Sequence, residues 1–336
     1  MNRSMRIIPV FCVLLVHVAK AEIYELPPEG YDVIGAISTV TAREEDTLVD
    51  IARRHGLGYE DIVRANPGVN VWVPGKGTEV ILPTRFVLPP GPREGVILNL
   101  AEYRLYYYPK VRDGETAYVM TYPISIGRMD WETPLGRTSV ISKVRNPSWY
   151  VPQSVLDEHA ADGRPLQRIV PPGPENPLGE YAMRLGLPGY LIHGTNRPAG
   201  VGMRVTHGCV RMFPEDIEYL FGKIDVSTAV RIINEPVKMG WEGNQLVIEV
   251  HPVLAVVLPE VIETPQAEIA ADVPDVVIVE AKDPLTYVTE QFIAVTGERA
   301  GQLDWHLAEQ IAYRSDGIPT LVGQGIKNAA ASAAFE

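Results

Sequence analysis

Cysteine is scarce in this sequence. Only Cys12 and Cys209 occur among 336 residues, and Cys12 lies in an apolar N-terminal segment that we expect to be removed. A chain left with one cysteine cannot form an internal disulfide, so its core alone must stabilise the fold. Cys209 is therefore either a buried, inert thiol or a reactive one, and its neighbours must decide between the two.

Basic residues are also few. The chain has 30 Lys and Arg against 42 Asp and Glu, which gives a formal net charge of −12. Proteins that bind nucleic acid usually carry a clustered basic face, and the sequence has no such cluster, so we exclude nucleic acid as a partner. Hydrophobic residues make up 46% of the chain. This fraction excludes disorder of the whole chain, and the length favours two or three domains.

The N-terminus has the layout of a secretory signal peptide. Arg3 and Arg6 precede an apolar run over residues 7–18, and Ala19-Lys20-Ala21 fits a small-x-small cleavage site. The run is too short to span a bilayer comfortably, which disfavours the alternative of an uncleaved anchor. We therefore predict that residues 1–21 are a signal peptide and that the mature, exported chain begins near Glu22.

The remaining chain divides into parts that differ in pattern, and 29 glycines with 29 prolines favour turns and short strands. Residues 37–83 are predicted to form a unit of strand, helix, helix and strand. Pro-rich residues 84–93 are predicted to be a linker. Residues 94–235 indicate a mainly β domain, with helices near 155–161 and 214–221. Residues 236–310 form an extension, and residues 311–336 are predicted to be a disordered tail.

Two histidines and the only cysteine of the mature chain fall between residues 193 and 209. His193 ends a predicted strand, and Thr206-His207-Gly208-Cys209 follows after residues 194–205. A cysteine needs a nearby base to attack as a thiolate, so we predict a depressed pKa for the Cys209 thiol and a histidine partner. His207 is too close along the chain to align readily with Cys209, whereas His193 can approach from a neighbouring strand.

Two other interpretations of this segment stay open. His193, His207 and Cys209 could hold a catalytic zinc ion, although no acidic residue within the segment could act as general base. The histidines could also be structural residues around a buried thiol. The adjacent glycines favour catalysis, because Gly194 and Gly208 leave room for a substrate backbone and free N–H groups for an oxyanion.

These segments resemble two known families. Residues 37–83 are similar to a LysM module, through EDTL at 45–48, IARR at 51–54, ANP at 65–67 and VILP at 80–83. Residues 94–250 resemble the L,D-transpeptidase catalytic domain, also called the YkuD domain, whose signature is a histidine followed by Ser/Thr-His-Gly-Cys. The spacing here is slightly short, but no reacting group is missing. Further matches are YPISIG at 122–127, TPLG at 133–136, NPSW at 146–149, NPLG at 176–179 and GMRV at 202–205.

The resemblance implies a mainly β catalytic domain with a β-sandwich-like core, preceded by a small α/β LysM module, in a periplasmic enzyme of Gram-negative type. It implies that Cys209 attacks the diamino-acid carbonyl of a peptidoglycan stem tetrapeptide, that D-Ala leaves, and that an amine resolves the thioester. His193 would move the protons, oriented by the backbone carbonyl of Gly194. His207 and Gly208 would supply oxyanion donors or shape the loop. No metal or organic cofactor is needed. Residues expected to bind substrate are Arg211, Arg204, Thr206, Tyr190 and Trp149, the two aromatic residues being equally consistent with the core.

The acceptor stays open at this point. It can be the amine of a second stem peptide, giving a 3→3 cross-link, or the terminal lysine of a Braun-type outer-membrane lipoprotein. Water as acceptor would make the protein an L,D-carboxypeptidase of the same fold. A non-catalytic LysM protein that binds glycan strands of the wall is a further alternative, which the intact pair of Cys209 and His193 disfavours. Carbapenems are expected inhibitors, because members of this family are typically acylated by them.

Overall fold

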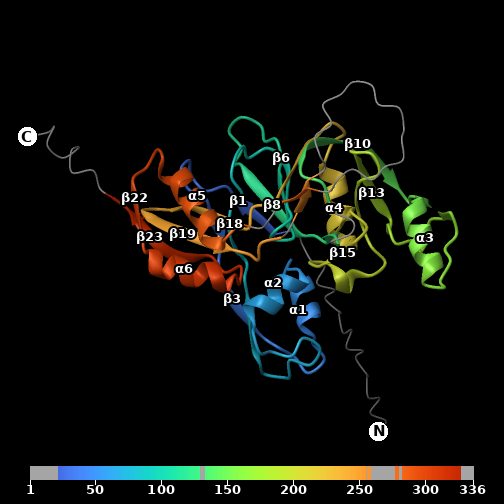
Figure 1. Cartoon of the computed structure of the whole chain (residues 1–336), viewed down its shortest axis with the longest axis horizontal. Coiled ribbons are helices and arrows are strands. Elements are labelled where there is room, and N and C mark those ends of the chain that lie inside the picture. Colours follow the sequence, from blue (N-terminus) through green and yellow to red (C-terminus); the bar gives the residue numbers. More distant parts are fainter. Residues whose placement is uncertain (1–21, 129–132, 255, 259–276, 280–281, 327–336) are drawn as a thin grey trace, which may run out of the picture.

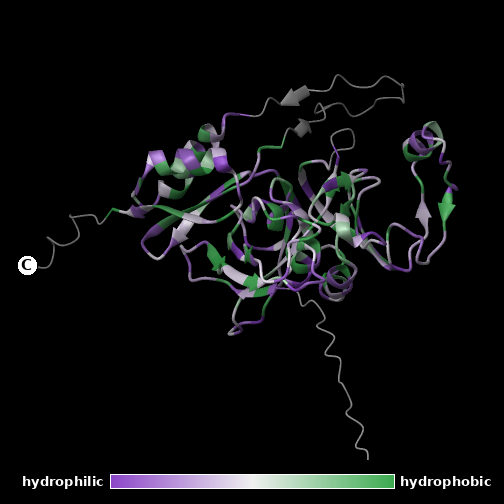
Figure 2. Cartoon of the chain, turned by 90° about the horizontal axis from the view of Figure 1, so that it is seen from below, coloured by the Kyte–Doolittle hydropathy of each residue, from purple (hydrophilic) through white to green (hydrophobic). Residues whose placement is uncertain are grey.

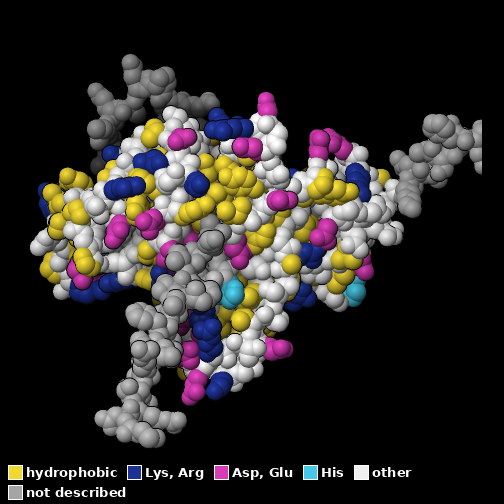
Figure 3. All heavy atoms as spheres, turned by 180° about the vertical axis from the view of Figure 1, so that it is seen from behind, with side chains coloured by type: hydrophobic (Ala, Val, Ile, Leu, Met, Phe, Trp, Pro, Cys, Tyr) yellow, Lys and Arg dark blue, Asp and Glu magenta, His cyan; other side chains and the backbone are white. Residues whose placement is uncertain are grey.

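The computed structural model describes residues 22–128, 133–254, 256–258, 277–279 and 282–326. The predicted signal peptide lies outside these ranges. Within them, no helix is both long and apolar enough to cross a membrane. Figure 1 shows a central β domain, a small helical module below it and an α/β domain at one end. On the face seen in Figure 3, cationic and anionic side chains are interspersed rather than gathered into a basic patch.

A nine-stranded mixed sheet forms the central domain, in the order β1-β8-β7-β6-β17-β10-β13-β14-β16. Its edge strand β1 (Glu22–Glu25) is the start of the predicted mature chain and pairs antiparallel with β8. The pairings β17–β6 and β14–β16 are parallel. The other strands are β6 (Gly95–Asn99), β7 (Arg104–Tyr108), β8 (Tyr118–Pro123), β10 (Gly136–Arg145), β13 (Tyr181–Leu185), β14 (Leu191–His193), β16 (Val210–Arg211) and β17 (Ala229–Ile233).

Short strand pairs and three helical segments complete the central region. The helices predicted near 155–161 and 214–221 are confirmed as α3 and α4. The bounds of these elements are β2 (Val33–Gly35) with β5 (Arg85–Val87), β9 (Ile126–Gly127) with β15 (Arg204–Thr206), β11 (Trp149–Tyr150) with β12 (Ile169–Val170), β20 (Val256–Leu258) with β21 (Val277–Val279), α3 (Gln153–Ala161), η1 (Pro198–Gly200) and α4 (Pro214–Lys223).

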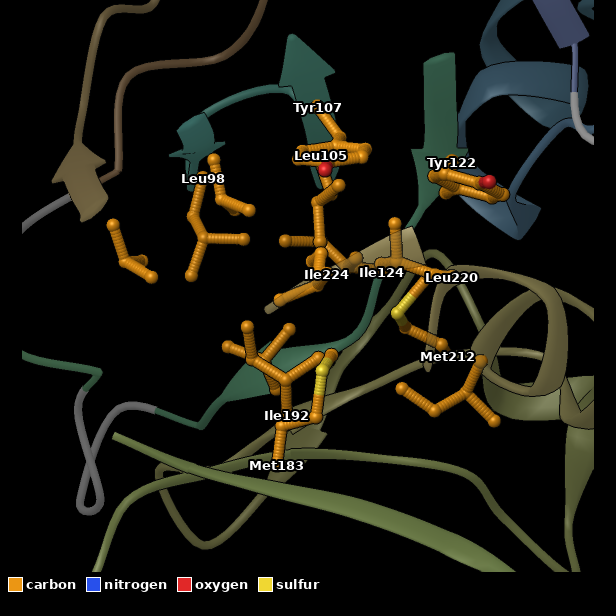
Figure 4. Packing of buried hydrophobic residues seen from close by; sticks show 14 of the residues in the cluster. Leu98, Leu105, Tyr107, Tyr122, Ile124, Met183, Ile192, Met212, Leu220 and Ile224 are labelled. Atoms are coloured by element: carbon orange, nitrogen blue, oxygen red, sulfur yellow. The ribbon is translucent and has the colours of Figure 1, made fainter. Parts of the chain in front are cut away.

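The central strands are buried on both faces, which explains their continuous hydrophobic runs. On β7, Leu105 and Tyr107 belong to the main core, whereas Tyr106 and Tyr108 belong to a second cluster that includes the apolar residues of the N-terminal module. Helix α4 closes the main core with an apolar face that includes Leu220. Figure 4 shows side chains from the strands and α4 interlocking in this core. The two-sided burial makes the sheet a rigid support for the residues at its edge.

The N-terminal module has the predicted order of strand, helix, helix and strand. Helix α1 begins after Thr47, whose hydroxyl accepts from the N–H of Asp50 while the Asp50 carboxylate accepts from the N–H of Thr47, a reciprocal cap. Strands β3 and β4 pair antiparallel. The bounds are β3 (Ser38–Thr41), α1 (Leu48–Arg54), α2 (Tyr59–Ala65) and β4 (Glu79–Leu82).

The N-terminal module is docked tightly on the central domain. Arg53 of α1 makes a two-pronged ion pair with Glu215 of α4, with N–O distances of 2.7 and 2.8 Å. At the start of α2, the Tyr59 N–H donates to the Val201 carbonyl at 2.9 Å. Gly202 has a φ of +87°, and a Cβ there would lie 2.3 Å from the Tyr59 nitrogen. Only glycine fits at this contact, so the docking is encoded in the sequence.

The predicted linker contributes to this rigidity. Part of residues 84–93 forms β5, and Val87 and Leu88 are buried. The Val87 N–H donates to the Glu249 carboxylate at 2.6 Å. This segment therefore fastens the N-terminal module and the C-terminal residues together.

The C-terminal residues form a four-stranded antiparallel sheet, β18-β19-β23-β22, with two helices. The prediction of a disordered tail over 311–336 is wrong for the part that the structure describes. Helix α6 extends to Arg314 and buries Ile311, and β23 adds Val322 to the same core. The Ala/Ser composition that suggested disorder belongs to residues 327–336, which lie outside the described residues. The bounds are β18 (Val237–Glu242), β19 (Gln245–Val250), α5 (Pro284–Thr296), β22 (Gly301–Leu303), α6 (Trp305–Arg314) and β23 (Thr320–Gly325).

A fully buried ionic cluster joins the C-terminal domain to the central one. The Lys238 ammonium donates to Glu102 of the central domain at 2.6 Å and lies 3.0 Å from a Glu249 oxygen. The Nε2 atom of His251 lies 2.7 Å from the same Glu249 oxygen. Burial alone would raise the pKa of Glu249, but Lys238 and His251 lower it to about 2. The cluster therefore holds paired charges where water is excluded.

Replacing Lys238 by methionine is expected to lower the free energy of unfolding by about 3–5 kcal/mol, because two buried carboxylates lose their cation. Urea unfolding followed by circular dichroism measures the change. Lys282→Met is the matched control, since its partner Glu290 is exposed and this pair should contribute little. Equal stability of the two variants would contradict a structural role for the buried cluster.

Candidate active site

A cavity of about 1230 Å³ lies against the β13–β14–β16 edge of the large sheet, and both His193 and Cys209 line it. Its other wall includes residues of an arm made by β11, α3 and β12, which projects from the central body in both Figure 1 and Figure 2. Trp149, predicted to contact substrate, lines the cavity from this arm. The residues that the sequence singled out therefore meet at one concave surface.

The strand register explains how the reactive side chains reach the cavity. Ile192 of β14 is buried in the main core, so its neighbours along the strand point to the opposite face. Strand β16 runs parallel to β14, with Ile192 opposite Val210 and His193 opposite Arg211. Cys209 directly precedes Val210 and therefore emerges on the cavity face, on the strand next to that of His193.

His193 is buried and held by backbone groups. Its Nδ1 lies 2.6 Å from the carbonyl oxygen of Gly194, the contact expected for an orienting group. Burial, with the nearby cation of Arg211, lowers the pKa of His193 to about 4. At neutral pH the imidazole is therefore uncharged and can accept a proton.

The pKa of the Cys209 thiol is shifted in the direction opposite to the one predicted from the sequence. We expected a depressed pKa, but burial raises it, and the backbone of Leu191 and the charge of Arg211 oppose this rise only in part. The thiol donates to the Gly189 carbonyl at 3.5 Å. The sequence could not reveal this, because burial depends on how distant loops close over the residue. Near neutral pH both the thiol and the imidazole are therefore uncharged, and a thiolate would form only by transfer of the thiol proton to a base.

The loop before Cys209 is fixed by hydroxyl groups. Thr206 donates to the Cys209 carbonyl at 2.6 Å, and Thr133 donates to the Gly208 carbonyl at 2.7 Å. Gly208 has a φ of +97°, which favours glycine. Thr133 was visible in the sequence only as part of the TPLG match, without a role. These bonds hold the backbone that surrounds the thiol.

His207 points away from the thiol and toward the arm. Its Nε2 lies 3.0 Å from a carboxylate oxygen of Glu158 on α3, and Arg128 donates to the other oxygen at 2.5 Å. These two bonds and the cation of Arg128 lower the pKa of Glu158. Sequence reasoning missed Glu158 because the contact joins residues that are 49 positions apart. The arm is thus tied through His207 to the loop that precedes Cys209.

The remaining predicted residues fall into two groups. Arg211 and Thr206 line the cavity, and burial together with the charge of Arg197 lowers the pKa of Arg211. Arg204 does not line the cavity, and its Nε donates to the Gly127 carbonyl at 3.0 Å. Tyr190 packs against the main core. The structure therefore brings Trp149, Thr206 and Arg211 to the site but not Arg204 or Tyr190.

The zinc interpretation is not supported by the arrangement of donor atoms. Within the described ranges, the one group of three or more His, Cys, Asp or Glu donors close enough to share a metal ion is Glu102, Glu249 and His251. There the Lys238 ammonium already contacts both carboxylates. His193, His207 and Cys209 do not form such a group.

Comparison with known proteins agrees with this geometry. Residues 93–232 match the L,D-transpeptidase catalytic domain (YkuD), and residues 40–72 match the LysM domain. The chain is 36% identical over 330 residues to "Probable L,D-transpeptidase ErfK/SrfK" of Salmonella typhimurium, covering 97% of this chain and 99% of that protein. It is 40% identical over 237 residues to "Probable L,D-transpeptidase YbiS" of Escherichia coli, covering 69% of this chain and 76% of that protein.

A solved structure, L,D-transpeptidase 3 from Mycobacterium tuberculosis, is similar over 46% of this chain and 66% of that one, with 21% identity and a TM-score of 0.30. The likeness to ErfK/SrfK spans nearly the whole chain, so it includes the C-terminal domain as well as the catalytic one. The mainly β fold class and both family resemblances drawn from the sequence are confirmed. The chain therefore belongs to the L,D-transpeptidases, with a YkuD catalytic domain and a LysM domain.

Proposed function

We propose that Cys209 forms a thioester with the diamino acid of a peptidoglycan stem tetrapeptide and passes this acyl group to an amine. The supporting observation is that a neutral His193 ends β14, that Cys209 directly precedes the parallel neighbouring strand β16, and that both line one cavity with the cation of Arg211 beside them. A thiol, a base and a carboxylate-binding cation are the groups that transfer of an anionic peptide requires.

The steps follow from the neutral resting state. His193 takes the Cys209 proton while the sulfur attacks the carbonyl carbon, and backbone N–H groups of the Gly208 loop stabilise the oxyanion. The C–N bond breaks as the imidazolium returns its proton to the nitrogen, so D-alanine leaves as a neutral amine. The acceptor amine then attacks the thioester and gives its proton to His193. When the C–S bond breaks, that proton returns to the sulfur.

We further propose that the enzyme acts in the periplasm after cleavage of residues 1–21, and that the LysM domain binds glycan strands. The leader pattern at Arg3, Arg6 and 7–18 supports export. The acceptor is the amine of a second stem peptide or the terminal lysine of a Braun-type lipoprotein. The L,D-carboxypeptidase activity is the second candidate, because it shares the same thioester.

Mass spectrometry of disaccharide-tetrapeptides incubated with residues 22–336 tests the proposal, in reactions with and without the lipoprotein. We expect loss of D-alanine and a product joined to the acceptor. The Cys209→Ala variant is the control and should leave the donor unchanged. Release of tripeptide alone, with no joined product for either acceptor, would assign the carboxypeptidase activity instead. An unchanged donor with the unaltered enzyme would refute both.

Arg211→Met is expected to raise the KM for tetrapeptides that carry a free diamino-acid carboxylate by about tenfold, because a charge-assisted hydrogen bond is lost. Labelling of Cys209 by iodoacetamide should still go to completion, which shows that the loop is intact. The amidated form of the same donor should respond less to the substitution. A comparable loss for both donors would show that Arg211 supports the loop rather than binding the carboxylate.

A further inference from the structure

The cavity is lined by more cationic side chains than the proposed reaction steps require. Arginines 184 and 197 line it together with Arg211, whereas Glu175 is the one acidic residue in its wall among the described residues. The Arg184 side chain is solvent-exposed, and no described residue forms an ion pair or hydrogen bond with its guanidinium. A cation left unpaired at the wall of a cavity is available to a ligand anion.

The register of the sheet relates Arg184 to the nucleophile. Arg184 of β13 lies opposite Leu191 of β14. Because Ile192 lies opposite Val210, Leu191 lies beside Cys209. Arg184, Leu191 and Cys209 thus form one row across three strands. With strands about 4.8 Å apart, the first and last of these residues are separated by about 10 Å.

Arg184 and Arg211 stand on different sides of the thiol. Arg211 lies on β16, two residues after Cys209. The charge of Arg197 lowers the pKa of Arg211, which indicates that Arg197 lies near Arg211. Arg184 is across β14, on the far side of the strand that carries His193. The cavity therefore has two separate cationic positions, one at Arg211 and one at Arg184.

The proton path indicates which part of the donor faces Arg184. The nitrogen that leaves must receive its proton from His193, so it lies near β14 and displaced from Cys209 toward β13. The carboxylate of the leaving residue is one carbon beyond that nitrogen. From there it can extend to the β13 side of the cavity, where Arg184 is the cationic residue.

We propose that Arg184 binds the C-terminal carboxylate of the leaving D-amino acid and so makes the enzyme select donors with a free C-terminus. This inference rests on the proposed function, since it assigns a second binding group to the same donor. An acceptor stem bound at the same place after D-alanine has left would not need this contact. Arg184 is thus a specificity-determining residue for the first half of the reaction.

Steady-state kinetics with two tetrapeptide donors, one with a free C-terminal acid and one with a C-terminal carboxamide, tests this role. We expect Arg184→Met to raise the KM for the free acid about tenfold, with kcat changed less than about twofold, and to leave the carboxamide unaffected. Arg184→Lys should restore part of the preference. High salt should narrow the difference between the two donors for the unaltered enzyme, because Arg184 is exposed.

Arg137→Met is the matched control, because it removes one exposed arginine from the same sheet outside the cavity. Its kinetics should equal those of the unaltered enzyme. An unchanged KM in Arg184→Met, or an equal rise for both donors, would overturn the assignment of the carboxylate to Arg184. Failure of the proposed function is distinct from this result, since the unaltered enzyme would then release neither D-alanine from the free acid nor D-alaninamide from the carboxamide.

Discussion

Incubation with a carbapenem is expected to add the mass of one drug molecule to the unaltered enzyme and nothing to the Cys209→Ala variant. The strained β-lactam amide presents an electrophilic carbonyl, and attack by the Cys209 sulfur opens the ring and leaves a thioester. Because burial raises the pKa of the thiol, attack depends on proton removal by His193 rather than on a standing thiolate. The ring nitrogen takes that proton when the C–N bond breaks.

The Cys209→Ser variant sharpens this test. A hydroxyl is a far weaker acid than a thiol, and an imidazole whose pKa is about 4 is too weak a base to compensate. We expect turnover of stem tetrapeptide to fall by a factor on the order of 10⁴ or more. Intact-protein mass spectrometry and the release of D-alanine measure the two effects. An adduct that persists in Cys209→Ala would remove Cys209 from its role as nucleophile.

His193→Ala is expected to slow acylation by a factor of about 10²–10⁴, the usual contribution of a positioned general base. Its pH dependence separates the base from a structural residue. In the unaltered enzyme the rate should fall only below about pH 4–5, because the imidazole loses its ability to accept a proton when it is protonated. In His193→Ala the rate should climb with pH toward the raised pKa of the thiol, since only the thiolate then attacks.

Stopped-flow measurement of carbapenem acylation from pH 4 to 10 gives both profiles. His306→Gln is the control, since this exposed histidine lies on α6 in the C-terminal domain. Its profile should coincide with that of the unaltered enzyme. An acid limb with a midpoint near pH 6.5 in the unaltered enzyme would show that His193 is not held neutral by burial.

The pair that we propose as catalytic could be singled out from the sequence because the information is local. His193 and Cys209 are sixteen positions apart, and their types and the glycines beside them already indicate a nucleophile and its base. The helices α3 and α4 could be predicted for a similar reason, since their starts are signalled within a few residues. By contrast, the partner of His207 is a carboxylate on a separate arm, and only the closed structure brings Glu158 to it.

The burial of individual side chains was the property that the sequence predicted least well. The direction of the pKa shift of Cys209 was predicted wrongly, because burial raises the pKa of the thiol and the extent of burial follows only from the folded chain. The C-terminal residues were misjudged for a related reason. The apolar face of α6 is short, and the residues that it packs against on β18 and β19 precede it by about 60 residues. No local sequence pattern therefore predicts that these elements share one core.

The contact between α2 and Gly202 holds the LysM domain at a fixed distance from Cys209. Two sites joined by a flexible chain sample many separations, whereas two docked sites keep one. Gly202 precedes β15, and η1 just before it borders the catalytic cavity. A glycan strand held by the LysM domain would therefore present its stem peptides to Cys209 only at a set distance from the point of attachment. The geometry of this one interdomain contact would then determine at which distance from the bound glycan a stem-peptide bond is cleaved and a new one is formed.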